Sequence, residues 1–522
     1  MIFNSGNIPL FQLKNHCFRC ILKRLHIFEN QEFIFMENTN KTVRTRFAPS
    51  PTGFMHVGNL RTALYAFLLA KSQGGTFVLR IEDTDQARFV EGATEVIYNT
   101  LARAGLVHDE GPDKGGEYGP YIQSERRDLY LPYAEELVKK GAAYYCFCDK
   151  QEGETQEAGT DPHETCPGHC RDLDPAEAAA KAASGVPFVI RQKIDRTGKS
   201  AYDDAVFGHI EIDNDVLDDQ ILIKQDKMPT YNFANVVDDH LMNITHVVRG
   251  AEYLPSTPKY NMLYRAFGWE IPQYVHLPLI MGRDAEGNVA KLSKRHGSVS
   301  FENLMQEGYL AEAVINYIAL LGWSPKNDRE VFTLEELISI FKVDGLNKAP
   351  AIFDYDKLMW MNTEYLKAMS PEAFAAASRP FAGVAGTPLE ARWAGFAPML
   401  QQRVNKLDEI PEKIAFLHAL PEYEIEIFNN KKSKCNPEVA KEILLELRPE
   451  FENLADWTAP AISAVLSGCA ERRTCKLGLP MWAVRIAVSG QMVTPGGPGE
   501  IMEILGKEEA MKRYDAALQK LN

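Results

Sequence analysis

The sequence lacks any apolar run long enough to cross a bilayer, and its first residues lack the apolar core of a secretory signal. We therefore expect a soluble, cytoplasmic protein. Net positive charge is also missing, because 71 acidic residues outnumber 57 basic ones and leave a formal net charge of −14. That balance argues against indiscriminate binding of nucleic acids, although basic residues gathered on one face would still permit a specific RNA partner.

Cysteine is scarce, and its placement does not suggest a disulfide framework. The chain has nine cysteines, several of them in short spacings. This usage is typical of free thiols or metal ligands in a reducing compartment. With 522 residues the chain is too long for one hydrophobic core, so we expect several domains.

Residues 1–41 differ in character from the rest of the chain. They mix Phe, Ile and Leu with Lys, Arg and His, and they end in the polar run Glu37-Asn-Thr-Asn-Lys41. We interpret them as an N-terminal extension, disordered or not translated, with Met36 as the true start. An organelle-targeting segment and a zinc half-site at Cys17-Phe-Arg-Cys20 are the alternative interpretations.

The most informative stretch is residues 45–65. An alternating run at 45–47 predicts a strand, and Pro49, Pro51 and Gly53 then predict a turn. From Leu60 the apolar residues recur at the spacing of one helix face, and residues 76–81 have the pattern of a buried strand. The unit therefore predicts a strand, a helix and a second strand of a nucleotide-binding α/β fold.

The start of this helix predicts a phosphate site. Gly58-Asn59 stands where the helix would be capped, so we expect unpaired N–H groups there to meet an anion. Gly58 would let the backbone approach closely, and His56 would add a further donor.

His56-Val-Gly-Asn59 resembles the first signature, HIGH, of the class I aminoacyl-tRNA synthetases. Lys291-Leu-Ser-Lys-Arg295 resembles their second signature, KMSKS, in the expected order along the chain. The flanking runs Arg46-Phe-Ala-Pro-Ser-Pro-Thr-Gly53 and Arg80-Ile-Glu-Asp-Thr-Asp85 are similar to the glutamyl and glutaminyl branch, and the run from His56 resembles its bacterial glutamyl members. The resemblance extends from about residue 42 to the C-terminus.

This resemblance implies an α/β class I synthetase fold: a Rossmann-type nucleotide fold with an α+β acceptor-binding insertion, followed by an all-α stem-contact and anticodon-binding region. We expect the catalytic fold over 42–143 and 227–300, the insertion over 144–226, the stem-contact domain over 301–370 and the anticodon-binding domain over 371–522. Within these ranges we expect helices at 90–106, 128–140 and 311–321, and strands at 186–194, 208–212 and 277–281.

The resemblance also assigns roles to individual residues. For ATP it implies His56, Gly58, Asn59, Glu252, Lys291, Ser293, Lys294 and Arg295, of which His56, Lys291 and Lys294 are the catalytic ones. For glutamate it implies Arg46 and Arg249 on the carboxylates, Glu82 on the ammonium group, and Ser50, Tyr231 and Asn235 around them. Because a guanidinium can hold a carboxylate through two parallel hydrogen bonds, two arginines suit glutamate better than glutamine.

A zinc site is predicted inside the insertion. Tyr144-Tyr-Cys-Phe-Cys148 and Cys166-Pro-Gly-His-Cys170 place two cysteine pairs across a polar, Gly-rich loop. Four thiolates on such knuckles can hold a tetrahedral Zn²⁺ and close the loop. The expected ligands are Cys146, Cys148, Cys166 and Cys170, with His169 as a substitute for one of the last two; free thiols are the alternative.

Beyond about residue 370 the chain is rich in Ala, Leu and Glu and shows no β-barrel alternation. The resemblance makes this a distinction between branches, since glutaminyl enzymes carry β-barrels there and bacterial glutamyl enzymes a helical bundle. Arg403 aligns with a family arginine that contacts the anticodon, although an ordinary surface arginine would fit the pattern equally well.

The activity that the resemblance implies is the ligation of L-glutamate to tRNA(Glu), with ATP and Mg²⁺ as co-substrates and one structural Zn²⁺, by an enzyme we expect to be a monomer. Glutaminyl-tRNA synthetase, or a glutamyl enzyme that also charges tRNA(Gln), is the alternative. An inactive paralogue would have lost its signature His or Lys, and a short paralogue that modifies a tRNA base would lack the helical C-terminal half; both features are present.

Overall fold

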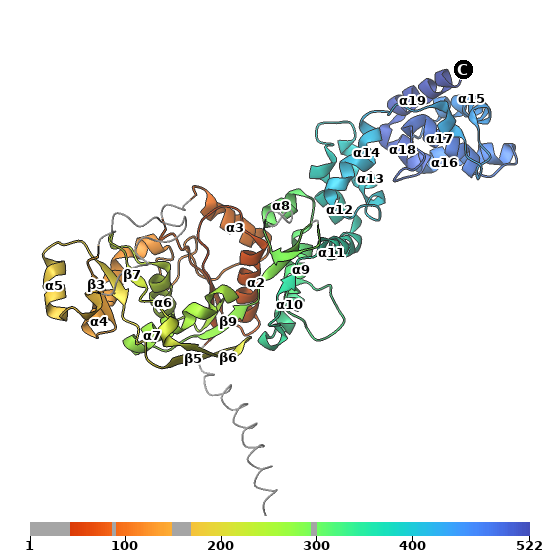
Figure 1. The fold of residues 1–522 in the computed structure, drawn as a ribbon. Helices are drawn as coiled ribbons and strands as arrows, with labels where there is room; N and C mark the ends of the chain where they lie inside the picture. The colour runs from red at the N-terminus through yellow and green to blue at the C-terminus, as the bar shows by residue number, and fades with distance from the viewer. Residues whose placement is uncertain (1–41, 86–89, 149–168, 285, 294–299) are drawn as a thin grey trace, which may run out of the picture.

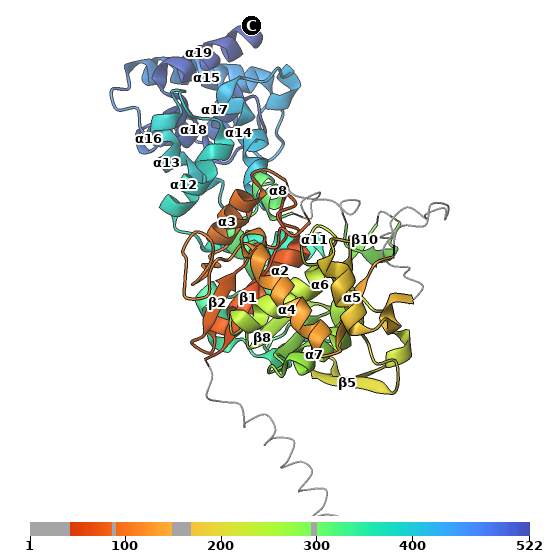
Figure 2. The ribbon, with the colours of Figure 1, turned by 90° about the vertical axis from the view of Figure 1, so that its left-hand side faces the viewer.

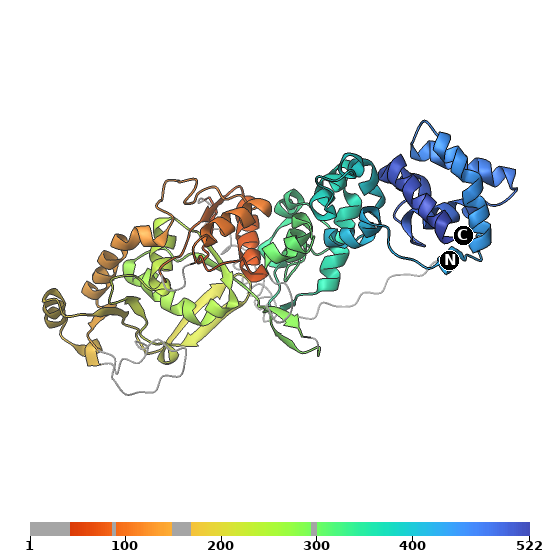
Figure 3. The same ribbon diagram turned by 90° about the horizontal axis from the view of Figure 1, so that it is seen from above.

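The computed structural model describes residues 42–85, 90–148, 169–284, 286–293 and 300–522. The N-terminal segment 1–41 and its alternative interpretations therefore lie outside the described residues. Figures 1 and 3 show an elongated molecule, with an α/β portion at one end and a series of helices that leads to the C-terminus at the other. Figure 2 shows the C-terminal helices gathered above the α/β portion.

A six-stranded sheet forms the centre of the α/β portion, in the order β2-β1-β8-β9-β5-β6. Neighbouring strands run parallel except for β6, which is antiparallel to β5. The strands are β1 (Arg44–Phe47), β2 (Thr76–Leu79), β5 (Lys199–Asp204), β6 (Gly208–Asp213), β8 (His246–Gly250) and β9 (Gln273–Leu277). The pairing of β1 with β2 across one helix confirms the predicted strand, helix and strand.

Helices cover this sheet and connect its parallel strands, as parallel pairing requires. The helix between β1 and β2, α2, is buried over most of its length and packs on β1, β2 and β8. The helices predicted at 90–106 and 128–140 are present with shorter or shifted bounds. The helices of this portion are α2 (Val57–Lys71), α3 (Ala93–Arg103), α4 (Arg127–Lys139), α5 (Pro175–Ala183), α6 (Tyr231–Leu241) and α7 (Thr257–Phe267).

Two smaller sheets flank the main one. The first has the order β3-β4-β7, from β3 (Ala143–Cys146), β4 (Val189–Gln192) and β7 (Ile221–Ile223). The second has the order β11-β10-β12, from β10 (Ile280–Arg283), β11 (Val289–Lys291) and β12 (Ala351–Ile352). The single strand predicted at 277–281 is wrong, because Pro278 separates β9 from β10, and the two belong to different sheets.

The insertion predicted over 144–226 is less separate than the sequence suggested. Its hairpin β5–β6 joins the main sheet through β9, where Asp204 lies opposite Tyr274. Only β3, β4 and β7 form a sheet of their own. In β5 exposed or half-buried residues alternate with buried ones, and in β6 half-buried residues alternate with exposed ones. Such alternation occurs at the edge of any sheet, so periodicity alone could not assign the hairpin to one sheet or the other.

The described chain after residue 300 is mainly helical, in agreement with the sequence. Its helices are α8 (Phe301–Gln306), α9 (Ala311–Ala319), α10 (Leu334–Ile340), α11 (Tyr355–Ala368), α12 (Pro371–Ala382), α13 (Trp393–Phe396), α14 (Ile410–His418), α15 (Pro437–Asn453), α16 (Ala459–Arg472), α17 (Gly478–Ser489), α18 (Pro498–Leu505) and α19 (Lys507–Lys520). Among the described residues no helix is both long enough and apolar enough to span a membrane.

Two large hydrophobic cores divide the molecule. The first runs from Val43 to Met361 and the second from Leu366 to Ala517. One helix, α11, contributes to both: Leu358 and Met361 are buried in the first core and Leu366 in the second. The two cores are therefore joined through a continuous helix rather than through a loop.

Candidate active site

The first turn of α2 differs from its prediction in one respect. His56 is the N-cap, and its Nδ1 accepts the N–H of Gly58 at 3.0 Å. The N–H of Asn59 donates to the carbonyl of His56 at 2.9 Å. The expectation that both N–H groups are unpaired is therefore wrong, because the cap residue lies two positions earlier than the sequence indicated and satisfies them itself.

This capping bond determines what His56 can offer a ligand. With Nδ1 as an acceptor, the neutral imidazole carries its proton on Nε2. Burial lowers the pKa of His56, and the positive charge of Lys291 lowers it further. A neutral ring with one N–H directed away from the helix is a hydrogen-bond donor that adds no charge of its own.

The second signature lies beside the first. Lys291 ends β11 and is exposed, opposite Met281 in the β10–β11 pair. Where the chain is described again, Ser300 forms an antiparallel bridge with His56, and the N–H of Phe301 donates to Met55 at 3.1 Å. The structure thus brings the two motifs together. Ser293 is described and half-buried, whereas Lys294 and Arg295 lie outside the described residues.

A cavity of about 420 Å³ opens between the first βα loop and the ends of β1 and β8. Its position at the carboxyl ends of parallel strands is where ligands bind in open α/β sheets. Seven of the residues predicted for substrates line it: Arg46, Ser50, Asn59, Glu82, Tyr231, Arg249 and Glu252.

One predicted glutamate contact, Asn235, does not line this cavity. It lies one turn beyond Tyr231 on α6, is 3% exposed, and its amide donates to the carbonyl of Tyr231 at 2.6 Å. The helix therefore places Asn235 behind Tyr231 rather than on the cavity wall.

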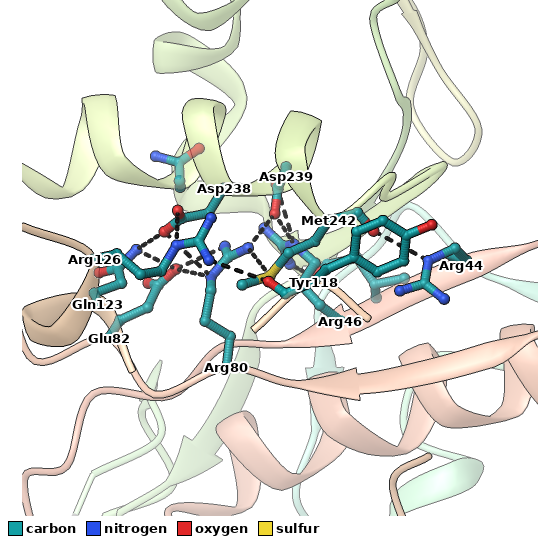
Figure 4. Close-up of polar contacts among 12 residues, drawn as sticks. Arg44, Arg46, Arg80, Glu82, Tyr118, Gln123, Arg126, Asp238, Asp239 and Met242 are labelled. Atoms are coloured by element: carbon teal, nitrogen blue, oxygen red, sulfur yellow. Dashed lines mark hydrogen bonds and ion pairs between the residues drawn. The ribbon is translucent and has the colours of Figure 1, made fainter. Parts of the chain in front are cut away.

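Beneath the cavity lies a buried network of charged side chains, shown in Figure 4. Two carboxylates extend from α6 toward guanidiniums that come from β1, from the residue after β2 and from the 3₁₀ turn at 123–126. Asp239 binds Arg46 at 3.1 Å and Arg80 at 2.8 Å, while Asp238 binds Arg126 at 2.7 Å. The charged members are Arg46, Arg80, Arg126, Glu82, Asp238 and Asp239, three of each sign.

Two members of this network line the cavity, Arg46 and Glu82, and Glu82 is the carboxylate of the two. It is 4% exposed and accepts from Arg80 at 2.9 Å. Burial raises the pKa of its carboxyl, and the guanidiniums of Arg80 and Arg46 offset part of that shift. On Asp239 the same two guanidiniums outweigh burial and hold the pKa below its usual value. A carboxylate so placed can receive a cationic group from the cavity.

Arg249 is the other charged group at this depth. It is 4% exposed and lines the cavity next to Tyr231 and Tyr253. Its polar contacts within the described part of the chain go to His276 at 3.1 Å and Thr257 at 2.7 Å, with no carboxylate among them. A buried guanidinium whose direct partners are uncharged favours an anionic ligand.

Sequence reasoning missed several residues of the site. Arg80 belongs to the motif at 80–85 without a predicted role, and Asp238, Asp239, His276 and Asp204 were not predicted as site residues. Adjacent aspartates in the apolar run of α6 were the available signal, since buried carboxylates need cationic partners. No local signal marks His276, whose partners are 27 and 72 residues away.

Three of the predicted zinc ligands lie close together at β3. The sulfur atoms of Cys146, Cys148 and Cys170 are within 4.8 Å of one another, and the Cys148 and Cys170 sulfurs are 3.6 Å apart. The fourth predicted ligand, Cys166, lies outside the described residues. His169 is exposed and is not part of the described group. Three converging thiols fit a tetrahedral zinc site that takes one further ligand.

Arg403 lies far along the chain, in the second core region. It is exposed in the turn between α13 and α14, where its N–H donates to Leu400 at 2.8 Å. Its charge contributes, after burial, to the lowered pKa of Arg485 on α17. The two arginines are therefore near neighbours.

Comparison with known proteins shows the family to which the chain is related. Residues 42–360 match the family model described as tRNA synthetases class I (E and Q), catalytic domain, and residues 355–518 match an anticodon binding domain. The chain is 52% identical over 484 residues to the glutamate–tRNA ligase of Clostridium novyi, covering 92% of this chain and 98% of that protein. A glutamate–tRNA ligase of Clostridium botulinum is 53% identical over 487 residues, covering 92% and 99%.

A solved structure resembles the whole described architecture. The crystal structure of a glutamate tRNA ligase from Elizabethkingia meningosepticum, in complex with its amino acid, superimposes with a TM-score of 0.79 at 35% identity. The match covers 92% of this chain and all of the other.

Proposed function

Because the chain belongs to the class I tRNA synthetases of the glutamate and glutamine branch, we propose that it joins L-glutamate to tRNA(Glu) in two steps. In the first step, the glutamate α-carboxylate attacks the α-phosphate of ATP, which is bound as its Mg²⁺ complex, and pyrophosphate leaves. In the second, the 2′-hydroxyl of the terminal adenosine attacks the activated carbonyl, and AMP leaves.

The observation that carries the choice of amino acid is the pair of opposite charges in one cavity. Arg249 has no carboxylate among its described contacts and therefore suits the side-chain carboxylate of the substrate. Arg46, on the same cavity wall, suits the other carboxylate of glutamate. Glu82 takes the ammonium group, and Ser50 and Tyr231 supply neutral contacts on the same wall. Glutamine would leave a guanidinium with a weaker partner, because its amide offers one oxygen and no charge.

ATP is placed by the two signatures. His56 donates its Nε2–H to phosphate oxygen, and Lys291, with Lys294 and Arg295, neutralises the charge that develops on the phosphates. Gly58, Asn59, Ser293 and Glu252 surround the nucleotide. Catalysis then rests on positioning and on charge stabilisation, without a covalent bond to the protein.

The remaining assignments complete this proposal. Residues 144–226 contact the acceptor end, 301–370 the tRNA stem and 371–522 the anticodon, with Arg403 as one contact there. Cys146, Cys148, Cys166 and Cys170 hold a structural Zn²⁺, and the enzyme acts as a cytoplasmic monomer. Asn235 supports Tyr231 from behind the cavity.

Amino-acid-dependent exchange of pyrophosphate into ATP tests the proposal. We expect exchange with glutamate once tRNA(Glu) is present, and a hundredfold stimulation by tRNA needs only about 2.7 kcal/mol of preference for the competent arrangement. Exchange with glutamine instead would identify the enzyme as a glutaminyl-tRNA synthetase. Charging assays with purified tRNA(Glu) and tRNA(Gln) then show whether both are substrates.

A further inference from the structure

Behind Arg249 lies a buried chain of three side chains, one from each of three adjacent strands. Arg249 on β8 and His276 on β9 are direct partners in the strand register. The Nε of Arg249 donates to Nε2 of His276 at 3.1 Å, and Nδ1 of His276 lies 2.6 Å from a carboxylate oxygen of Asp204, at the end of β5. The side chains of His276 and Asp204 are completely buried.

The carboxylate fixes the tautomer of the imidazole. Asp204 can only accept, so the proton of the neutral ring resides on Nδ1, and Nε2 is left with a lone pair. That lone pair faces the Arg249 N–H. Asp204 is itself held in place, because it also accepts backbone N–H groups from Val206 at 2.9 Å, Phe207 at 2.8 Å and His276 at 3.1 Å.

These contacts determine the plane of the Arg249 guanidinium. Nε is bound by His276 and Nη2 by Thr257 at 2.7 Å, so two points of a rigid fork are fixed. Of the five N–H groups of an arginine, three are then left for the cavity that Arg249 lines. The negative charge of Asp204 also balances the guanidinium at the distance of one imidazole ring.

We propose that His276 and Asp204 are positioning residues, which orient Arg249 for the side-chain carboxylate of the substrate and so contribute to the preference for glutamate over glutamine. This inference rests on the proposed function. It assigns a role in substrate selection to Asp204, which belongs to the edge hairpin β5–β6 rather than to the motifs of the site.

The decisive variant is Asp204→Asn, which keeps the volume of the side chain. Its amide can donate to Nδ1, so the imidazole proton moves to Nε2 and faces the Arg249 N–H. In pyrophosphate exchange by the full chain with tRNA(Glu) present, we expect the KM for glutamate to rise about 10- to 100-fold, with kcat changed far less. The KM for ATP should stay unchanged, and the ratio of glutamate to glutamine exchange should fall.

Two variants at position 276 separate orientation from packing. His276→Gln retains an acceptor for Arg249, whereas His276→Leu fills similar space without one. We expect His276→Gln to recover a large part of the glutamate affinity that His276→Leu loses, at similar melting temperatures. A purely structural role would instead make KM follow the melting temperature.

The matched control is His108→Gln. His108 is also buried and paired with an aspartate, Asp113 at 2.7 Å, but it does not line the cavity. It should leave the KM for glutamate unchanged whatever it does to stability. An unaltered KM in both Asp204→Asn and His276→Leu would overturn the inference while leaving the proposed function intact. Wild-type protein that fails to exchange with glutamate would overturn both.

If His276→Leu does not fold, the Asp204→Asn and His276→Gln variants still test whether His276 and Asp204 position Arg249. Normal KM and normal discrimination against glutamine in both of these would reject the positioning role.

Discussion

Glu82 shows how one buried residue can set the pH dependence of substrate binding. Its carboxyl faces the cavity, and burial raises its pKa above the ordinary 4.5, partly offset by Arg80 and Arg46. In the proposed function Glu82 binds the ammonium group of the substrate, and only its ionised form can attract that group. Affinity is therefore complete above the Glu82 pKa and lost as pH falls through it, at a higher pH than for a surface glutamate.

We expect the KM for glutamate to rise as pH is lowered into the acidic range, because a growing fraction of Glu82 is protonated, and to do so at a higher pH than an ordinary glutamate would cause. Glu82→Gln should raise the KM about 10- to 100-fold at neutral pH and flatten this dependence. Pyrophosphate exchange across this pH range measures both effects, with the KM for ATP as the internal control. A variant that keeps the wild-type pH profile would show that Glu82 does not receive the ammonium group.

Lys291 is the described lysine of the second signature. In the proposed function its charge acts where phosphate charge builds up. Lys291→Ala should therefore cost about 2 to 4 kcal/mol of transition-state stabilisation for adenylate formation, with glutamate affinity nearly intact. The pKa of His56 should rise, because Lys291 contributes to lowering it.

Single-turnover adenylate formation measures the rate, and a pH profile measures the shift. Lys71→Ala is the control, since Lys71 ends the same helix that His56 begins and pairs with Asp109 instead. An unchanged rate in Lys291→Ala would remove this lysine from the catalytic assignment. For Lys294 the sequence predicts the same loss, and Lys294→Ala is the companion variant.

At this scale the sequence predicted residues that belong to continuous motifs. Arg46, Glu82, Tyr231 and Arg249 line one cavity as expected, because each lies in a motif at the end of a strand or at the start of a helix. The sequence could not predict contacts that tertiary packing makes between distant segments. The His276–Asp204 pair spans 72 residues, and Asn235 was misplaced because one helical turn separates a wall residue from a buried one.

The β3 strand and the 3₁₀ turn at 169–172 are the elements that bring the cysteine group together. We predict that elemental analysis finds one Zn²⁺ per chain. The Cys146→Ser variant should lose both the Zn²⁺ and the charging of tRNA. Cys435→Ser is the control, because Cys435 is buried in the second core, away from this group. Metal-free protein with full charging activity would mean that these thiols are incidental.

Other elements show where periodicity reaches its limit. The helix α2 was predicted from its apolar spacing, and α3 and α4 correspond to the helices predicted at 90–106 and 128–140, with ends that differ from the predicted ones by up to three residues. Of the hairpin β5–β6, only β6 was predicted, as a strand at 208–212, and its place in the main sheet was not, since pairing partners are not encoded in a two-residue period. Pro278 could have divided the strand predicted at 277–281, because it cannot donate to a ladder.

At the scale of the whole molecule, α11 links the two halves of the structure, because its residues complete the first core and begin the second. The two family models also overlap within it, one ending at residue 360 and the other starting at 355. Both Leu358 and Met361 are fully buried in the first core. A division of the chain before α11 would therefore leave the first core incomplete.

We predict that a chain ending at residue 368 retains the folded catalytic portion, whereas one ending at residue 354 is strongly destabilised. Loss of a fully buried Leu or Met side chain costs about 2 to 5 kcal/mol each, and here two are removed with the helix that carries them. Thermal melting and limited proteolysis of both truncations measure the difference. Equal melting temperatures would show that α11 adds nothing to the first core.

Because α11 is packed into a core at each end, it also fixes the rotation of the C-terminal helices about its axis relative to the catalytic portion. Each residue added to an α-helix turns everything beyond it by about 100° and advances it by about 1.5 Å. One alanine inserted between Met361 and Leu366 would therefore swing the C-terminal helices to a different side of the catalytic portion, whereas seven alanines would restore the direction to within about 20°. Because the proposed function has one tRNA contact both ends of the enzyme at once, charging should fail with one added residue and recover in part with seven.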